Sequence, residues 1–260
     1  MALAKKRSLG QNFLRSKKAI AKIVEAGKIV AGEIVLEAGP GEGILTAALL
    51  EAGAKVIAVE KDRRLIPTLQ QKFSAEISCG QLTLVEADVL EFDVKSQLSK
   101  VNCYKIIANI PYYITGAFIR KFLEAEIQPS TMVILVQKEV AQRIVARDKK
   151  ESILSISVKA YGTPRYIQTV KAGSFSPAPN VDSAVLAIEN ISKDWLSGVD
   201  EKRFFEIVKA GFAHKRKMIS GNLKPILENQ TEEKISQCDI KTKARAEELT
   251  LENWLCLSKN

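Results

Sequence analysis

The sequence predicts an α/β protein in which a doubly wound, mostly parallel sheet precedes a small all-helical C-terminal domain. From residue 33 onward, short apolar segments alternate with longer helical segments, and most of these apolar segments lack in/out alternation. Strand signals stop after about Ser192. Repeated strand–helix units form open sheets with right-handed crossovers, and strands covered on both faces read as continuous apolar runs. We therefore expect two domains, 1–192 and 193–260.

Each expected element follows from these patterns in chain order. Apolar runs predict strands of the parallel sheet at 34–36, 56–59, 82–85, 106–108 and 132–136. Helices are expected between and after them, at 43–53, 62–73, 114–125 and 138–147. Three further runs predict strands that end the sheet with an antiparallel edge, at 153–160, 166–170 and 184–188. The C-terminal domain is expected to contain helices near 201–213, 215–228, 231–238 and 242–257.

The composition is that of an ordinary globular chain. The 260 residues are 46% hydrophobic and 27% charged, and no apolar run is long enough to cross a bilayer. No apolar segment follows the basic N-terminus, so a secretory signal is not expected. There is no CxxC spacing, and His214 is the single histidine, which argues against a metal site. Scattered cysteines predict reduced thiols in a cytoplasmic protein: Cys79, Cys103, Cys238 and Cys256.

Positive charge is concentrated near the N-terminus. The net charge is +9, and residues 1–30 contain eight basic residues against the single acidic residue Glu25. Such a segment attracts a polyanion, which makes nucleic acid a candidate partner. Composition alone leaves a solubilising tail as the alternative. The candidate RNA contacts in this segment are Lys5, Lys6 and Arg7.

A glycine-rich turn follows the first predicted strand and opens the first helix. It reads Glu37-Ala-Gly39-Pro-Gly41-Glu-Gly43, and glycines there permit a tight turn and close approach of backbone amides to a ligand. Glu60 ends the next strand about 20 residues further on, where a carboxylate can accept hydrogen bonds from both ribose hydroxyls. Together these features predict a nucleotide site, with a purely structural turn as the alternative.

The same turn discriminates between nucleotides. Dinucleotide sites typically carry GxGxxG, whereas this turn reads GxGxG. Glu37 would repel a pyrophosphate but suits an amino group and a sulfonium. Asp88, just past the third strand, can accept a hydrogen bond from an adenine amino group, or can simply cap a turn. The set Glu37, Gly39, Gly41, Glu60 and Asp88 resembles the S-adenosylmethionine site of Rossmann-like class I methyltransferases, and NAD is the alternative cofactor.

The segment Asn109-Ile110-Pro111-Tyr112 ends the fourth predicted strand, beside the switch point where such sheets bind ligands. It resembles the catalytic motif of amino-methyltransferases. An adenine 6-amino group is a poor nucleophile, because its lone pair is delocalised into the ring. The Asn109 side-chain carbonyl and the Ile110 backbone carbonyl can accept its two hydrogens and direct the lone pair toward a methyl group. Pro111 stiffens the loop, and Tyr112 offers a stacking face worth about 1–3 kcal/mol.

A second aromatic residue, Phe175, begins a segment with two alternate prolines, Pro177 and Pro179. The prolines are expected to hold the segment extended and to present the Phe175 ring. A base extracted from its stack needs a slot between two flat surfaces, and Tyr112 and Phe175 are candidates for its walls. A core position for Phe175 is the alternative.

These segments carry a resemblance to one family. Residues 9–14 (Leu-Gly-Gln-Asn-Phe-Leu), the glycine turn, 109–112 and 175–183 occur in the order seen in ribosomal RNA adenine dimethyltransferases. The resemblance runs from about residue 7 to the C-terminus. It implies that Asn12 and Leu14 close over the cofactor, that Gly39, Glu60, Asp88 and Asn109 complete the cofactor site, and that two methyl groups are placed on one adenine amine. In this family, bacterial small-subunit enzymes modify two adjacent adenosines near the 3′ end of 16S rRNA in the 30S subunit, and a related branch modifies 23S rRNA.

The C-terminal domain favours the small-subunit branch. Residues 210–217 are similar to the basic helix that opens the family's RNA-contacting domain, and the candidate contacts are Lys215, Arg216 and Lys217. The chain has Gly221-Asn222 where the family often has an Asn pair. A solvated basic helix face is the alternative.

Three functions remain in contention from the sequence. The first is 16S rRNA adenine dimethylation by a monomer, with the 23S rRNA branch as its variant. The second is an NAD-linked oxidoreductase, for which no hydride-transfer acid or base is apparent. The third is a non-catalytic assembly or transcription factor that kept the fold.

Overall fold

The computed structural model describes residues 12–98, 101, 103–196 and 198–259. By their contacts these residues form two compact units. One comprises the described parts of Met1–Ala141 and Arg165–Ile191, and the other those of Gln142–Pro164 and Ser192–Asn260. The functional division at residue 192, into a catalytic and an RNA-contacting domain, remains a prediction.

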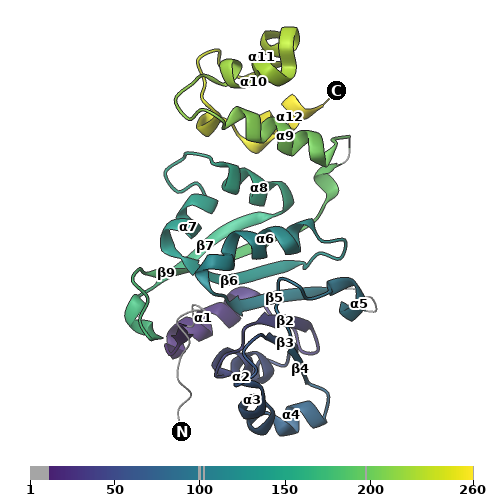
Figure 1. Ribbon diagram of the computed structural model, residues 1–260, viewed down its shortest axis with the longest axis vertical. Coiled ribbons are helices and arrows are strands. Elements are labelled where there is room, and N and C mark those ends of the chain that lie inside the picture. The colour runs from purple at the N-terminus through teal and green to yellow at the C-terminus, as the bar shows by residue number, and fades with distance from the viewer. Residues whose placement is uncertain (1–11, 99–100, 102, 197, 260) are drawn as a thin grey trace. The chain divides into compact units, whose positions relative to one another are not determined.

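The first unit is built around a sheet that, in the described part of the chain, has seven strands in the order β4-β3-β2-β5-β6-β9-β7 (Figure 1). Strands β4, β3, β2, β5 and β6 are parallel, and β9 runs antiparallel to β6. This confirms the predicted parallel sheet with an antiparallel end. The strand bounds are β2 Ile34–Ala38, β3 Lys55–Glu60, β4 Leu82–Glu86, β5 Tyr104–Asn109, β6 Thr131–Gln137, β7 Thr163–Val170 and β9 Ser183–Glu189.

The strand order places a topological switch point between β2 and β5. From β2 the chain moves outward through β3 and β4, and then returns to β5 on the other side of β2. The segments that leave the carboxyl ends of β2 and β5 therefore diverge. Crevices of this kind, outside the carboxyl ends of parallel strands, are where open α/β sheets bind ligands.

Helices of the first unit pack on the sheet. Helix α1 contacts β5, β6 and β9, and α2 contacts β3 and α1. Their apolar side chains join a core in which Ile23, Leu49 and Ile107 are fully buried. The helix bounds are α1 Lys17–Gly27, α2 Ile44–Glu51, α3 Ile66–Lys72, α4 Ser74–Ser78, α5 Val94–Leu98, α6 Thr115–Glu124 and α7 Lys138–Ile144, of which α7 continues into the second unit.

A short two-stranded sheet, which was not predicted, joins the N-terminal segment to the segment after β7. Strand β1 (Phe13–Leu14) pairs antiparallel with β8 (Phe175–Ser176). The amide of Arg15 extends this pairing by donating to the carbonyl of Ser174. The described end of the N-terminal segment is thus tied to the first unit. Short 3₁₀ turns lie at η2 Tyr112–Ile114, η3 Ala172–Ser174, η4 Asp194–Leu196, η5 Glu228–Gln230 and η6 Ala246–Glu248.

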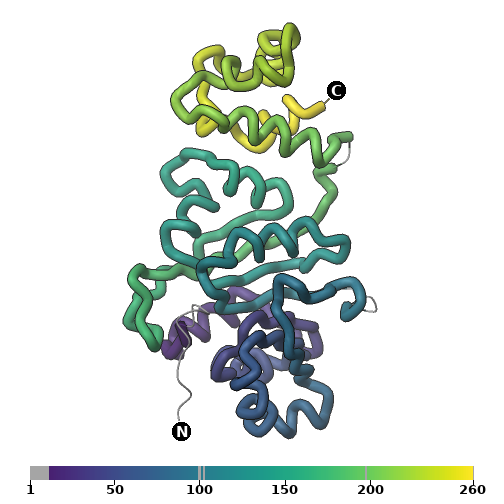
Figure 2. Tube along the Cα trace, in the orientation of Figure 1, coloured from purple at the N-terminus to yellow at the C-terminus, as the bar shows by residue number. Residues whose placement is uncertain are grey.

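The second unit is helical. Figure 2 shows its C-terminal helices gathered together in green to yellow, and α9 contacts both α10 and α12. Trp254 is fully buried, and a Cβ atom at Gly211 would lie 2.3 Å from its ring, so α9 approaches α12 closely at this glycine. The bounds are α8 Ile153–Tyr161, α9 Glu201–Gly211, α10 Ile219–Leu227, α11 Thr231–Gln237 and α12 Leu251–Ser258.

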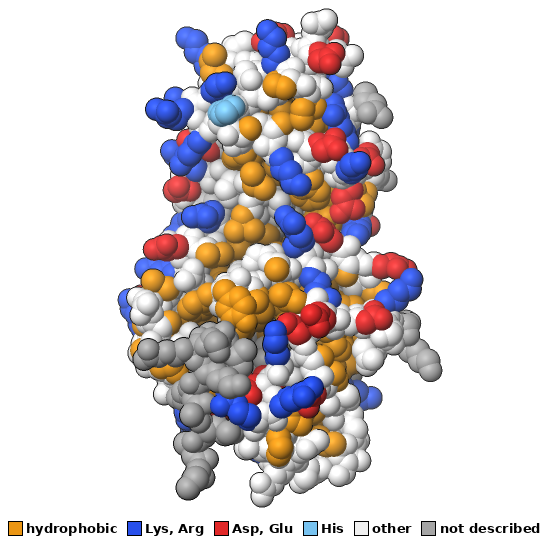
Figure 3. Space-filling view, in the orientation of Figure 1, with side chains coloured by type: hydrophobic (Ala, Val, Ile, Leu, Met, Phe, Trp, Pro, Cys, Tyr) orange, Lys and Arg blue, Asp and Glu red, His pale blue; other side chains and the backbone are white. Residues whose placement is uncertain are grey.

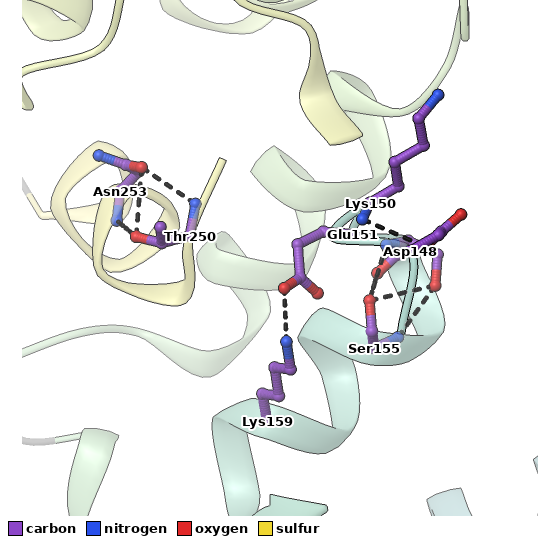
Figure 4. Close-up of polar contacts among 8 residues, drawn as sticks. Asp148, Lys150, Glu151, Ser155, Lys159, Thr250 and Asn253 are labelled. Carbon is purple, nitrogen blue, oxygen red and sulfur yellow. Dashed lines mark hydrogen bonds and ion pairs between the residues drawn. The ribbon is translucent and has the colours of Figure 1, made fainter. Parts of the chain in front are cut away.

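Helix α8 corrects the predicted strand at 153–160. Apolar and polar residues alternate there, which is a strand pattern, but Ser152 forms a capping box with Ser155 and starts a helix. Figure 4 shows Ser155 of this cap and, one turn further on, the ion pair between Lys159 and Glu151. The helix packs on α9 and α12. The N-terminal cap and the packing against other helices therefore favour a helix over the strand that the alternating pattern predicts.

The expected helix at 215–228 begins later, at Ile219. The basic residues Lys215, Arg216 and Lys217 lie in a turn between α9 and α10, and all three are exposed. The basic segment is therefore a turn and not a helix face. Similarly, α12 begins at Leu251 after Thr250, whose hydroxyl accepts the amide of Asn253 in a second capping box (Figure 4).

The expectation of four reduced cysteines is wrong for two of them. Cys238 and Cys256 form a disulfide across 18 residues of chain, with their Cα atoms 5.6 Å apart. Cys238 directly follows α11 and Cys256 lies in α12, whose Asn253 Nδ2 donates to the Cys238 carbonyl at 3.1 Å, a contact that no sequence spacing indicated. Cys79 and Cys103 are free and exposed. In the described part of the chain, no helix is long and apolar enough to cross a bilayer.

Candidate active site

A cavity in the first unit lies at the carboxyl ends of β2, β3 and β5. It is lined by the N-terminal segment, the glycine turn, the end of β3, the segment after β4 and the motif after β5. The structure therefore brings together five stretches that are far apart in the sequence. The predicted site residues among its lining are Asn12, Gly39, Gly41, Glu60, Asp88, Asn109, Ile110, Pro111 and Tyr112.

The glycine turn needs its glycines for two different reasons. Gly39 and Gly41 both have positive φ values, of 66° and 58°, which residues other than glycine rarely adopt. A Cβ atom at Gly39 would meet no atom within 4 Å, so the backbone there is open for approach by a ligand. A Cβ atom at Gly41 would lie 2.7 Å from the ring of Phe13, so this glycine is also required by packing. Phe13, which lines the cavity, was not predicted as a site residue.

Glu60 presents a fixed pair of carboxylate oxygens. Its side chain is only 6% exposed, and its oxygens accept the amides of Gly41 at 3.0 Å and of Asp62 at 2.8 Å. Burial raises the pKa of Glu60, and the backbone amides work in the opposite direction. Each carboxylate oxygen can accept more than one hydrogen bond, so acceptor capacity remains for a ribose diol.

Asp88 is held by a residue that the sequence did not single out. Its Oδ2 accepts Lys61 Nζ at 2.6 Å, and its Oδ1 accepts the amide of Leu90 at 2.9 Å. Burial acts to raise the pKa of Asp88, but the Lys61 ammonium and the Leu90 amide outweigh burial and hold it below its usual value. Asp88 is therefore an ionised acceptor, and Lys61 lines the same cavity.

Asn109 is oriented by the N-terminal segment. Its Nδ2 donates to the backbone carbonyl of Asn12 at 3.1 Å, across 97 residues of chain. This bond uses the amide nitrogen and leaves Oδ1 as the acceptor of the side chain. The predicted catalytic role of Asn109 needs an acceptor at this place.

Tyr112 is anchored through its hydroxyl. The hydroxyl and Ser183 Oγ lie 2.6 Å apart, and Ser183, on β9, is fully buried. Burial raises the pKa of Tyr112, against the effect of the Ser183 hydrogen bond. Pro111, at φ −59°, immediately precedes the 3₁₀ turn that carries Tyr112. The Tyr112 ring is thus a half-buried, fixed wall, and Ser183 is a positioning residue that the sequence did not indicate.

Three predicted site residues do not line the cavity. Glu37 is 1% exposed, burial raises its pKa to about 8, and its Oε2 has no partner among the described residues. A raised pKa favours the uncharged acid, and the role of Glu37 at the cofactor site stays a prediction. Leu14 and Phe175 face each other in the β1–β8 pair and are each 5% exposed, within the core. The role of Phe175 as a stacking platform stays a prediction, and its ring would have to leave the core to perform it.

Of the predicted RNA contacts, the structure describes only the three in the second unit, and these do not line the cavity. Lys215, Arg216 and Lys217 are exposed in the second unit, and blue Lys and Arg side chains are numerous on the visible face of its surface (Figure 3). Lys5, Lys6 and Arg7 lie outside the described residues. The RNA-binding roles of all six remain predictions.

Comparison with known proteins decides the family. The model of the family described as "Ribosomal RNA adenine dimethylase" matches residues 2–260. The chain belongs to this family. The dimethylase is 38% identical to the ribosomal RNA small subunit methyltransferase A of Dehalococcoides mccartyi, over 98% of this chain and 88% of that protein. It is 39% identical to the same-named protein of Fusobacterium nucleatum, over 100% of this chain and 98% of that one.

Solved structures agree with this assignment. The dimethylase superposes on the crystal structure of the 23S rRNA methyltransferase ErmE with a TM-score of 0.79 and 28% identity, covering 95% of this chain and 98% of that one. A dimethyladenosine transferase from Plasmodium falciparum gives a TM-score of 0.78 and 25% identity, covering 94% of this chain and 95% of that one. The fold is therefore the Rossmann-like class I methyltransferase fold.

The dimethylase is an S-adenosylmethionine-dependent methyltransferase, and its substrate is ribosomal RNA. This decides against the NAD-linked oxidoreductase. The residues present fit the methyl donor: the backbone at Gly39 is open, the fixed acceptors of Glu60 would suit a ribose diol, and the ionised Asp88 would suit an adenine amino group. Their roles in donor binding remain predictions.

Proposed function

We propose that this dimethylase methylates the 6-amino groups of two adjacent adenosines near the 3′ end of 16S rRNA in the 30S subunit, as a cytoplasmic monomer. The observation that carries the chemistry is the Asn109 side chain, whose Oδ1 remains as an acceptor at the cavity once Nδ2 is bonded to Asn12. The choice of 16S rRNA draws on relatives named for the small subunit at 38–39% identity, against 28% for the 23S rRNA enzyme.

Asn109 and Ile110 act on the nucleophile. The two hydrogens of the adenine amine are accepted by Asn109 Oδ1 and by the backbone carbonyl of Ile110. Both bonds draw the nitrogen toward a tetrahedral shape and direct its lone pair toward the donor. Bound S-adenosylmethionine would supply an electrophilic methyl group for transfer from its sulfur to this nitrogen. The amine then loses one proton to solvent. Orientation supplies most of the acceleration, and no strong general base is required.

In the second methyl transfer, only one of the two carbonyl acceptors still receives a hydrogen bond from the amine. A monomethylated amine has one hydrogen left, so one of the two carbonyls loses its partner and the first methyl group takes that place. Tyr112 is held by Ser183 and does not need to move between the two transfers. Stacking on its ring is independent of the state of the amine.

The test is transfer of labelled methyl groups to unmethylated 30S subunits and, separately, to naked 23S rRNA, with mass analysis of the nucleosides. We expect dimethyladenosine only from the 30S particles. Product only from 23S rRNA would move the dimethylase to the other branch and leave its chemistry intact. No product from either, with donor binding confirmed by calorimetry, would favour a non-catalytic factor.

Two variants separate donor binding from chemistry. Asn109→Ala should retain most donor affinity and lose methyl transfer by about 100-fold or more, because the amine loses the acceptor that directs its lone pair. Glu60→Ala should instead weaken donor binding, because the ribose loses its buried acceptor. Near-normal turnover by Asn109→Ala would contradict the mechanism.

A further inference from the structure

Tyr113 is the aromatic residue of this motif that the proposed chemistry does not use. Its ring lines the cavity, yet it is 66% exposed, more than any other large hydrophobic side chain in the described part of the chain. Isolated exposed hydrophobic residues are common, and Val30, at 64%, is one that lies away from the cavity lining. Tyr113 differs from Val30 because it lines the candidate active-site cavity while most of its side chain remains exposed.

The backbone gives Tyr113 a fixed direction that differs from that of Tyr112. Both lie in the 3₁₀ turn η2, in which the Ile114 amide donates to the Pro111 carbonyl at 3.2 Å and the Thr115 amide to the Tyr112 carbonyl. With three residues per turn, successive side chains point about 120° apart. Tyr112 points toward Ser183, to which its hydroxyl is bonded, and Tyr113 points toward solvent. The two rings cannot share one base.

The side chain of Tyr113 has Lys61 as an electrostatic neighbour but forms few other specific contacts with the protein. Among the described residues its hydroxyl forms no hydrogen bond, and its ring takes part in no aromatic pair. Packing therefore does not explain the aromatic ring at this position. A ring that is rigidly placed, exposed and beside a nucleobase cavity is suited to stacking on a second base, since every base offers a π-face.

We propose that Tyr113 is a second stacking platform, which receives the nucleobase next to the one held in the cavity. The inference rests on the proposed function. Extracting one adenosine from its stack leaves its neighbour with an uncovered face, and an aromatic ring at the rim replaces the lost stacking. When either of the two adjacent adenosines occupies the cavity, the other is such a neighbour. Tyr113 thereby selects a strand that can place a base on its ring, without reading that base's hydrogen-bonding edge.

The first test compares Tyr113→Ala with Tyr113→Phe, and uses Val30→Ala as the matched exposed control. Tyr113→Ala should raise the KM for unmethylated 30S subunits by about fivefold to 100-fold, the loss expected for one stacked base. Donor affinity, measured by calorimetry, and the melting temperature should not change. Tyr113→Phe retains the ring and should restore KM, and Val30→Ala should behave as the wild type. A normal KM in Tyr113→Ala, or a loss confined to donor affinity, would overturn the proposal.

The second test finds the base that stacks. The probe is a short RNA with two adjacent adenosines, in which the base on either side of the target is replaced in turn by an abasic residue. One of these abasic RNAs should bind the wild type as weakly as the unmodified RNA binds Tyr113→Ala. Tyr113→Ala should bind this abasic RNA and the unmodified RNA with equal affinity. Additive losses would show that the ring and the base act separately, which refutes the inference. Failure of the wild type to methylate 30S subunits would instead count against the proposed function, because this test measures binding alone.

Discussion

Glu37 belongs to the glycine motif in the sequence, but its side chain does not line the cavity that the motif forms. Glu37 immediately precedes the glycine turn in the sequence, but its carboxyl group is buried and is not part of the cavity lining. Burial raises its pKa to about 8. The charge of Glu60 adds to this rise, and Thr46 and Lys72 oppose it. An acid with a raised pKa in the folded state costs stability as the pH increases, because the unfolded chain releases its proton earlier.

Glu37→Gln should therefore stabilise the dimethylase by an amount that depends on pH. The gain should be small near pH 4.5, grow as the pH rises toward about 8, and level off above that value. The measurement is the free energy of unfolding of both proteins, without donor, across this range. A difference that stays constant with pH would show that Glu37 is ionised in the fold, or that its effect lies in packing.

At the scale of elements, the basic turn between α9 and α10 is a loop with its own support. Asn222 of α10 is 4% exposed and donates to the carbonyls of Gly211 at 2.6 Å and His214 at 3.1 Å. These bonds hold the backbone at Gly211 and at His214, directly before the basic residues. Lys215 and Arg216 therefore extend from an ordered backbone. A turn of this kind can present cations to a phosphate backbone as well as a helix can.

Replacing Lys215, Arg216 and Lys217 together by alanine should weaken binding to rRNA and flatten its salt dependence. The slope of log affinity against log salt should fall by about 0.7 for each phosphate that is no longer neutralised on a single strand, and by about 0.9 on a duplex. Lys55→Ala, which removes an exposed cation at the amino end of β3, is the control and should leave the slope unchanged. An unaltered slope in the triple variant would remove this turn from the RNA footprint.

At the scale of the whole molecule, the two units are stabilised by different means. The first has a large apolar core around its sheet. The second buries apolar side chains such as Phe204 and Trp254 and is also cross-linked by the disulfide between Cys238, directly after α11, and Cys256 in α12. A cross-link that closes a loop of this length restricts the unfolded chain and stabilises the fold by about 3 kcal/mol.

Cys256→Ser should lower the free energy of unfolding of the oxidised protein by about this amount. A reducing agent should have the same effect on the wild type and little further effect on the variant. Cys79→Ser, at a free and exposed cysteine, is the control and should remain as stable as the wild type. Equal stability of the oxidised and reduced wild type would mean that helix packing alone holds this unit together.

The sequence by itself determined the parallel sheet, the glycine turn with Glu60 and the motif at Asn109, because each depends on residues close together in the chain. Apolar runs with helical segments between them specify strand and helix locally. The same local reasoning missed α1, although Ser16 caps it and Ile20, Ile23 and Gly27 repeat at helical spacing. It predicted a strand at α8, because apolar and polar residues alternate there, whereas Ser152 caps a helix.

Only the tertiary structure decided how the site is held together. The bond between Asn109 and Asn12 joins residues 97 apart in the chain, and that between Tyr112 and Ser183 joins residues 71 apart. The burial of Phe175 follows from the pairing of β1 with β8, and the disulfide joins Cys238, directly after α11, to Cys256 in α12. Such contacts depend on where the whole chain places distant segments. No local preference of the residues encodes them, since the same side chains would suit many other partners.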